Sequence, residues 1–61
     1  MKTYSVIKVQ VGGAAAEQHI EADRCTVDLS GALQFWRGEE REEMVKAFAA
    51  GRWYQVEEVP A

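Results

Sequence analysis

Polar and apolar residues alternate through most of this chain, and that pattern limits the fold more than any other feature. The stretch Thr3–Val11 alternates in this way and predicts a half-buried strand, because side chains of a strand point to opposite faces in turn. Gly12-Gly13 ends the stretch, since glycine permits the backbone angles of a tight turn, so we expect a hairpin loop there. Ile7, Val9 and Val11 lie on one face of this strand, and Tyr4 and Val6 lie on the other.

The alternation resumes after this loop but changes its parity. From Gln18 to Ala22 the inward positions are even-numbered, and from Arg24 to Leu29 they are odd-numbered. One extra residue exchanges the two faces of a strand, so we predict a bulge or a strand break at Asp23. The residues expected to point inward are Ile20, Ala22, Cys25, Val27 and Leu29.

A second hairpin is predicted around Ser30-Gly31. A two-residue loop would pair residues of opposite faces. A three-residue loop, 29–31, places Gly31 at the left-handed position that this hairpin type favours. It pairs Val27 with Leu33 and Cys25 with Phe35. The partner strand is then Ala32–Trp36, with Leu33 and Phe35 inward and Trp36 on the opposite face.

The segment from Gly38 to Ala50 has two interpretations. As a helix it would hold Glu39, Glu40, Glu42 and Glu43 near its positive end and Gly51 at its C-terminal cap. As a strand it would follow a turn at 38–41 and run over 42–49, with Lys46 on the face of Met44 and Phe48. The last segment, 52–58, alternates again, with Tyr54 and Val56 on one side and Trp53 on the other.

Together these patterns predict a mainly β fold. We expect one small domain, residues 1–61, built as an antiparallel meander or half-barrel of about five strands. The alternative is an α+β fold with one helix at about 39–50 on a three- or four-stranded sheet. A chain of this size buries only roughly 60% of its unfolded surface, so help from a partner chain is expected.

Two stretches of the sequence carry a resemblance. EADRCTVDLSGALQFWRG and VKAFAAGRWYQVEEV contain an A-D pair, a G-A-L-x-F hairpin and an A-F-A-x-G-x-W-x-x-V ending. In these features the chain resembles small uncharacterised proteins of high-GC bacteria and their phages. The resemblance covers about two-thirds of the chain and implies no activity. It implies a small antiparallel sheet in which Met44–Ala49 is a strand, although the connection GEEREE is longer and more acidic here.

Composition excludes several kinds of site. The single Cys25 cannot form an internal disulfide, and with the single His19 it cannot complete the four ligands of a structural zinc site. No serine or cysteine forms a nucleophile motif with His19, so we expect no enzyme activity, catalytic residue, metal or cofactor. The chain has no apolar run long enough for a membrane span, and its alternating N-terminal stretch does not look like a signal peptide, so we expect a cytoplasmic protein without a membrane partner.

Charge makes nucleic acid a poor partner. The net charge of −3 arises entirely in residues 38–61, where six glutamates outnumber three basic residues. The acidic region of this chain repels a phosphate backbone but attracts a basic protein surface. We therefore expect a protein partner or a second copy of the chain, in a homodimer.

The residues that point to binding are two tryptophans, each beside an arginine, and a run of glutamates. Tryptophan and arginine are enriched in interface hot spots. Trp36 and Trp53 lie opposite the main apolar set of their strands and so form either an exposed surface or a second core layer. The candidate site residues are Trp36, Arg37, Arg52, Trp53, Glu39, Glu40, Glu42 and Glu43.

Two functions fit these residues. The first is a non-enzymatic protein-binding or self-associating module, encoded by a phage or mobile element. The alternative is an acidic inhibitor of a host nucleic-acid-binding protein, such as a defence-system component in the manner of an anti-CRISPR protein. The two differ in salt dependence, because an acidic surface binds a basic partner more weakly as ionic strength rises.

Overall fold

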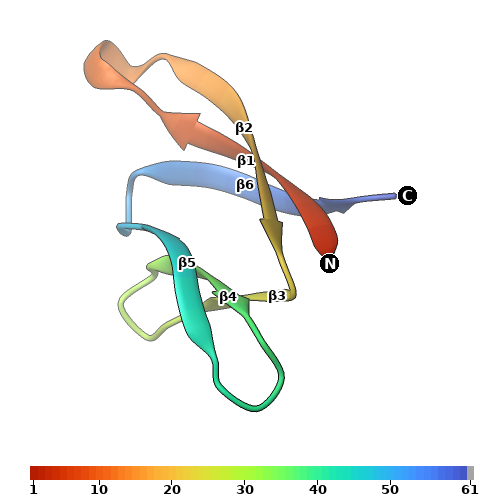
Figure 1. Ribbon diagram of the computed structural model, residues 1–61. Coiled ribbons are helices and arrows are strands. Elements are labelled where there is room, and N and C mark those ends of the chain that lie inside the picture. The colour runs from red at the N-terminus through yellow and green to blue at the C-terminus, as the bar shows by residue number, and fades with distance from the viewer. Residues whose placement is uncertain (61) are drawn as a thin grey trace.

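The computed structural model describes residues 1–60, which form two antiparallel sheets of three strands each (Figure 1). The first sheet has the order β2-β1-β6 and the second the order β3-β4-β5. The prediction of a mainly β fold is confirmed, whereas the single meander or half-barrel of about five strands is not exact, because six strands form two sheets. Residues 39–50 form a turn and a strand, so the helix of the alternative α+β fold is absent from this segment. The elements are β1 (Lys2–Val9), a 3₁₀ turn (Val11–Gly13), β2 (Ala15–Ala22), β3 (Arg24–Val27), β4 (Leu33–Arg37), β5 (Glu43–Phe48) and β6 (Trp53–Val59).

The hairpin predicted at Gly12-Gly13 joins β1 to β2. The Gln10 N–H donates to the Ala14 carbonyl at 2.7 Å, and the pairing then runs from Val9 with Ala15 to Lys2 with Ala22 without a register shift. Both glycines adopt positive φ, 85° and 84°, which only glycine adopts without strain. Val11 belongs to this turn and is fully exposed.

The core face of β1 is the one that carries Tyr4 and Val6, and not the one that carries Ile7 and Val9. Both residues are buried, whereas Ile7 is only partly buried. Cross-strand neighbours explain the difference: Tyr4 lies opposite Ile20 and Val6 opposite Val56. The face of Ile7 is surrounded by polar partners, and the second sheet packs against the other side.

The break predicted at Asp23 is confirmed and takes the chain from the first sheet into the second. β2 ends at Ala22 and β3 begins at Arg24. The Asp23 N–H donates to the Trp36 carbonyl at 2.8 Å, and its carboxylate accepts the Gly38 N–H at 2.7 Å. Asp23 therefore ties the crossing between the sheets to the turn that follows β4.

The second hairpin has the predicted loop and register. Val27 pairs with Leu33 and Cys25 with Phe35, and Gly31 has a φ of 93°. The Asp28 carboxylate accepts hydrogen bonds from Ser30 N–H (2.9 Å), Ser30 Oγ (2.6 Å) and Ala32 N–H (3.0 Å), which lower its pKa, the Ser30 side chain most.

Val27 lies on the inner face opposite Leu33, as predicted, but both Val27 and Leu29 are exposed. β3 is an edge strand that ends at Val27, and Leu29 lies in the loop. Both therefore lie outside the contact between the sheets.

A register shift in β5 changes the face of Met44. Phe35 pairs with Lys46 and Trp36 with Met44, which leaves Val45 as an extra residue. Such a bulge exchanges the faces of the strand. Met44 therefore shares the face of Trp36, and Lys46 shares only that of Phe48, whose ring centroid lies 5.6 Å from Lys46 Nζ. The prediction that all three share one face was wrong.

A second register shift, in β6, brings Trp53 to the core. Ile7 pairs with Gln55 and Lys8 with Trp53, so Tyr54 is the extra residue. Trp53 and Val56 consequently share the inner face and pack against the core, while Tyr54 is exposed. The prediction that Tyr54 shares the side of Val56, opposite Trp53, was wrong for the same reason.

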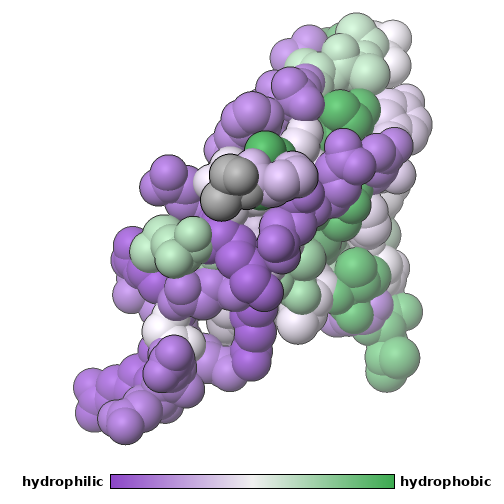
Figure 2. All heavy atoms as spheres, turned by 90° about the vertical axis from the view of Figure 1, so that its right-hand side faces the viewer, coloured by the Kyte–Doolittle hydropathy of each residue, from purple (hydrophilic) through white to green (hydrophobic). Residues whose placement is uncertain are grey.

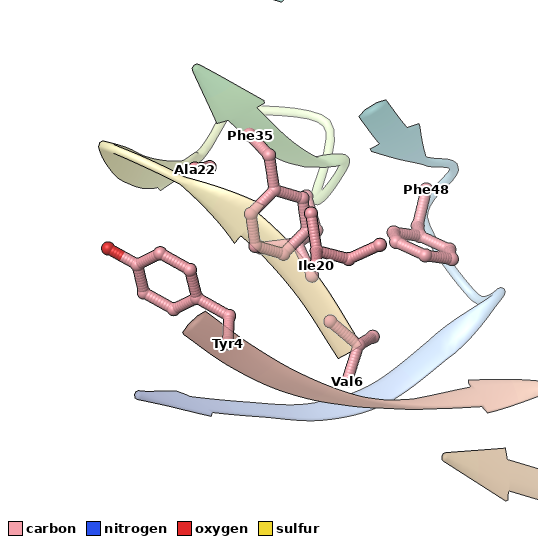
Figure 3. Packing of buried hydrophobic residues seen from close by; sticks show 7 residues of the cluster. Tyr4, Val6, Ile20, Ala22, Phe35 and Phe48 are labelled. Carbon is pink, nitrogen blue, oxygen red and sulfur yellow. The ribbon is translucent and has the colours of Figure 1, made fainter. Parts of the chain in front are cut away.

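The core lies between the two sheets and is centred on Phe35 (Figure 3). Its ring is completely buried and lies 5.4 Å from the ring of Tyr4 in the first sheet and 6.2 Å from that of Phe48 in the second, measured between centroids. Trp53 Nε1 adds a link between the sheets, because it donates to the Gly31 carbonyl at 3.0 Å. Within residues 1–60 no helix has the length and hydropathy needed to cross a membrane.

Candidate functional site

The outer face of the second sheet carries an apolar surface around Trp36. Arg24, Trp36 and Met44 form one row across β3, β4 and β5, since they pair directly in the register. Val45 lies beside this row at the bulge. The neighbouring Phe35 points into the core, so Trp36 points away from it. We call Arg24, Trp36, Met44 and Val45 the Trp36 surface.

The indole of Trp36 is fixed in place. Its Nε1 donates to Thr26 Oγ1 at 2.9 Å, and the Arg24 guanidinium carbon lies 5.9 Å from the ring centroid. Arg24 in turn forms an ion pair with Glu42. A half-buried aromatic ring held in this way loses little side-chain freedom when another surface packs on it.

The other predicted tryptophan and arginine residues do not join this surface. Trp53 packs against the core from β6. Arg37 ends β4, and its Nη2 lies 3.4 Å from Glu43 Oε2. Arg52 precedes β6 and lines a surface depression with the end of β1 and the start of the turn that follows it. Although each tryptophan is next to an arginine in the sequence, these residues therefore do not form one surface.

The four predicted glutamates divide into two pairs. Glu39 and Glu40 lie exposed in the turn between β4 and β5, and Figure 2 shows hydrophilic residues at this lower end of the molecule. Glu42 and Glu43 are each paired with an arginine of the second sheet. The charge that this turn presents is therefore smaller than the sequence indicates.

A larger acidic surface lies on the outer face of the first sheet. Glu17, His19 and Glu21 alternate along β2, and Glu57 of β6 lies opposite Ser5 of β1, which is also opposite His19. We call Glu17, His19, Glu21 and Glu57 the acidic face. The residues that the register places there include no lysine or arginine. The signal for this face in the sequence is the i, i+2, i+4 spacing of Glu17, His19 and Glu21 on one strand. The charge count did not reveal the face, because residues 1–37 carry equal numbers of acidic and basic residues.

Ser5, Glu17 and His19 meet on this face. Ser5 Oγ donates to Glu17 Oε2 at 2.6 Å, and His19 Nε2 lies 3.6 Å from Glu17 Oε1. Nucleophilic catalysis requires the base to bond the hydroxyl and a third group to orient the base. Here the carboxylate stands between serine and imidazole, and Ser5 is buried. This arrangement orients the side chains of the acidic face and does not match a nucleophile with an oriented histidine base.

Cys25 is half-buried and unpaired. Burial raises the pKa of its thiol, while the neighbouring Tyr4 hydroxyl acts in the opposite direction. Among the residues described, no group of three or more His, Cys, Asp or Glu side chains is placed to hold a metal ion.

Comparisons with models of known protein families, with curated proteins and with solved structures find no match to this chain.

Proposed function

We propose that this protein is a non-enzymatic protein-binding module that uses the Trp36 surface. One observation carries the proposal: a fixed indole lies on a sheet face that no other element of residues 1–60 covers, beside Met44 and Val45, which are 45% and 40% exposed. Aromatic residues, methionine and arginine are the types enriched in protein interfaces, and a few such residues supply most of the binding energy.

The acidic face supports a second candidate, the acidic inhibitor of a nucleic-acid-binding protein. Three carboxylates on one sheet face, with no lysine or arginine in the same rows, would attract a basic partner surface. This candidate places the contact on the first sheet, whereas the sequence placed it at Glu39–Glu43. The two candidate functions therefore use different sheets.

The experiment compares variants of both surfaces against a partner captured from the organism that encodes the chain. Met44→Glu tests the Trp36 surface without touching the core, and Trp36→Ala tests its centre. Tyr54→Ala is the matched control, because Tyr54 is an exposed aromatic residue outside both surfaces. Loss of affinity of at least about tenfold is expected for the first two changes and little for the third, by the usual weight of hot-spot residues.

Salt separates the two candidates. Binding through the Trp36 surface should change little with ionic strength. If the combined change of Glu17, Glu21 and Glu57 to glutamine abolishes binding and its salt dependence, while Met44→Glu leaves both intact, the acidic face is the working site and the Trp36 proposal is wrong.

A further inference from the structure

We propose that the open edge of β2 pairs antiparallel with β2 of a second copy of this chain, so that two first sheets join into one six-stranded sheet. This inference concerns self-association and does not rest on the Trp36 surface. The two proposals can therefore fail separately.

The edge of β2 carries unused hydrogen-bonding groups. β2 is the terminal strand of the first sheet, and its hairpin closes with a bond from Gln10 N–H to the Ala14 carbonyl. Because the ladder alternates and has no shift, the even-numbered residues of β2 bond to β1. The odd-numbered residues direct their N–H and C=O groups to the open edge: Ala15, Glu17, His19 and Glu21.

The other open edges are protected against such pairing. β5 has a bulge at Val45 followed by Lys46, β6 has a bulge at Tyr54, and β3 has only four residues. Bulges, lysines and short strands are the usual means by which proteins block edge pairing. β2 has eight residues and contains no bulge, lysine or proline.

Length and charge together select one register for this pairing. Residues directly opposite each other must share a face, and the outward groups belong to odd-numbered residues, so a symmetric ladder centres on one residue of β2. Centring on residue 18 or 19 pairs seven of the eight residues of β2, whereas centring on residue 17 or 20 pairs only five. Centring on Glu17 places this carboxylate opposite Glu17 of the partner subunit. Centring on His19 places Glu17 opposite Glu21 of the partner subunit. Both registers oppose like charges, which is destabilising.

Centring on Gln18 avoids these repulsions. Glu17 then faces His19 of the partner subunit, twice by symmetry, so each carboxylate meets an imidazole that can donate a hydrogen bond to it. Glu21 faces Ala15 of the partner subunit. The hairpin turn at Gly12-Gly13 and the bend at Asp23 end the pairing on both sides.

The test has two arms. In the first, sedimentation equilibrium from low micromolar to near millimolar concentration measures the dimer constant of each variant. His19→Glu opposes like charges in two symmetric pairs and should weaken the dimer about tenfold or more, from the usual size of cross-strand pair effects. His19→Lys should leave it as tight or tighter. The matched control is Gln55→Glu, which adds a negative charge to the exposed outer face of β6, away from the β2 edge, and should have no effect.

The second arm locates the register by oxidation. In a Cys25→Ser background, Glu17→Cys, Gln18→Cys and His19→Cys are compared for the rate of disulfide dimer formation. Gln18→Cys should be fastest, because the two copies of position 18 form a non-hydrogen-bonded pair whose close Cα atoms suit a disulfide. A monomer at all concentrations, a faster reaction at 17 or 19, or a dimer lost in Met44→Glu but kept in His19→Glu would overturn the proposal.

Discussion

The Cys25 thiol illustrates how packing between the sheets acts on a single residue. Cys25 belongs to β3 of the second sheet, and Tyr4, whose hydroxyl influences its pKa, belongs to β1 of the first. Burial raises the pKa of both groups above their ordinary values. Because only the thiolate reacts, a raised pKa and partial burial both slow modification.

We expect native Cys25 to react with a thiol reagent more slowly than the denatured chain at the same pH, with its rate rising only at a higher pH. As the pH rises, the thiol of the unfolded chain loses its proton before the native thiol does. The contribution of the protonated Cys25 thiol to the free energy of unfolding is therefore complete below the ordinary thiol pKa and is lost as the pH rises through the native pKa. Labelling followed by mass spectrometry measures this. Equal rates in native and denatured protein would contradict the burial of the thiol.

At the level of elements, the turn between β4 and β5 depends on Gly38. Its φ is 97°, and an added Cβ would clash with the Arg41 carbonyl oxygen. Gly38→Ala should therefore lower the free energy of unfolding by clearly more than about 1 kcal/mol, since it adds a backbone clash to the strain of a positive φ. Gly51→Ala is the control, because Gly51 has a φ of 81° with nothing near the added Cβ. Urea unfolding should place Gly38→Ala at the lower midpoint, and equal midpoints would refute the clash.

Alternation and turn chemistry predicted the elements well, and the bulges explain much of what they missed. The loop at 29–31 and the break at Asp23 have direct signals in the sequence, a glycine position and a change of parity. The extra residues Val45 and Tyr54 have none, because a bulge is decided by pairing with a distant strand. The bulge at Val45 places Met44 beside Trp36, and the bulge at Tyr54 places Trp53 in the core. The sequence could therefore identify Trp36 as a candidate but not its neighbours.

At the scale of the whole molecule, the two outer faces differ in chemistry while the inner faces share one core. The first sheet presents carboxylates, and the second presents an indole, a methionine and a valine. Dimer formation through β2 would leave the Trp36 surface open and would place two acidic faces on one continuous sheet. One small protein could thus associate with itself through one sheet and bind a partner through the other.

The last prediction concerns the cooperativity of the two sheets. Neither three-stranded sheet has a core of its own, because the buried residues of each pack against those of the other and Phe35 touches rings from both. The two sheets should unfold together at a fixed protein concentration. Trp36→Phe leaves Trp53, between the sheets, as the fluorescent reporter, and Trp53→Phe leaves Trp36, on the outer face. Within each variant, fluorescence and far-ultraviolet circular dichroism should give coincident transitions.

Phe35→Leu, introduced into each single-tryptophan variant, should shift the signal of either reporter by the same free energy. Phe35→Ala, which removes about 3–5 kcal/mol at such a site, should leave a domain of this size largely unfolded. If Phe35→Leu instead moves the Trp36 transition and leaves the Trp53 transition in place, the sheets unfold independently. Phe35 would then stabilise only the second sheet, and the shared core would not be what holds the two sheets together.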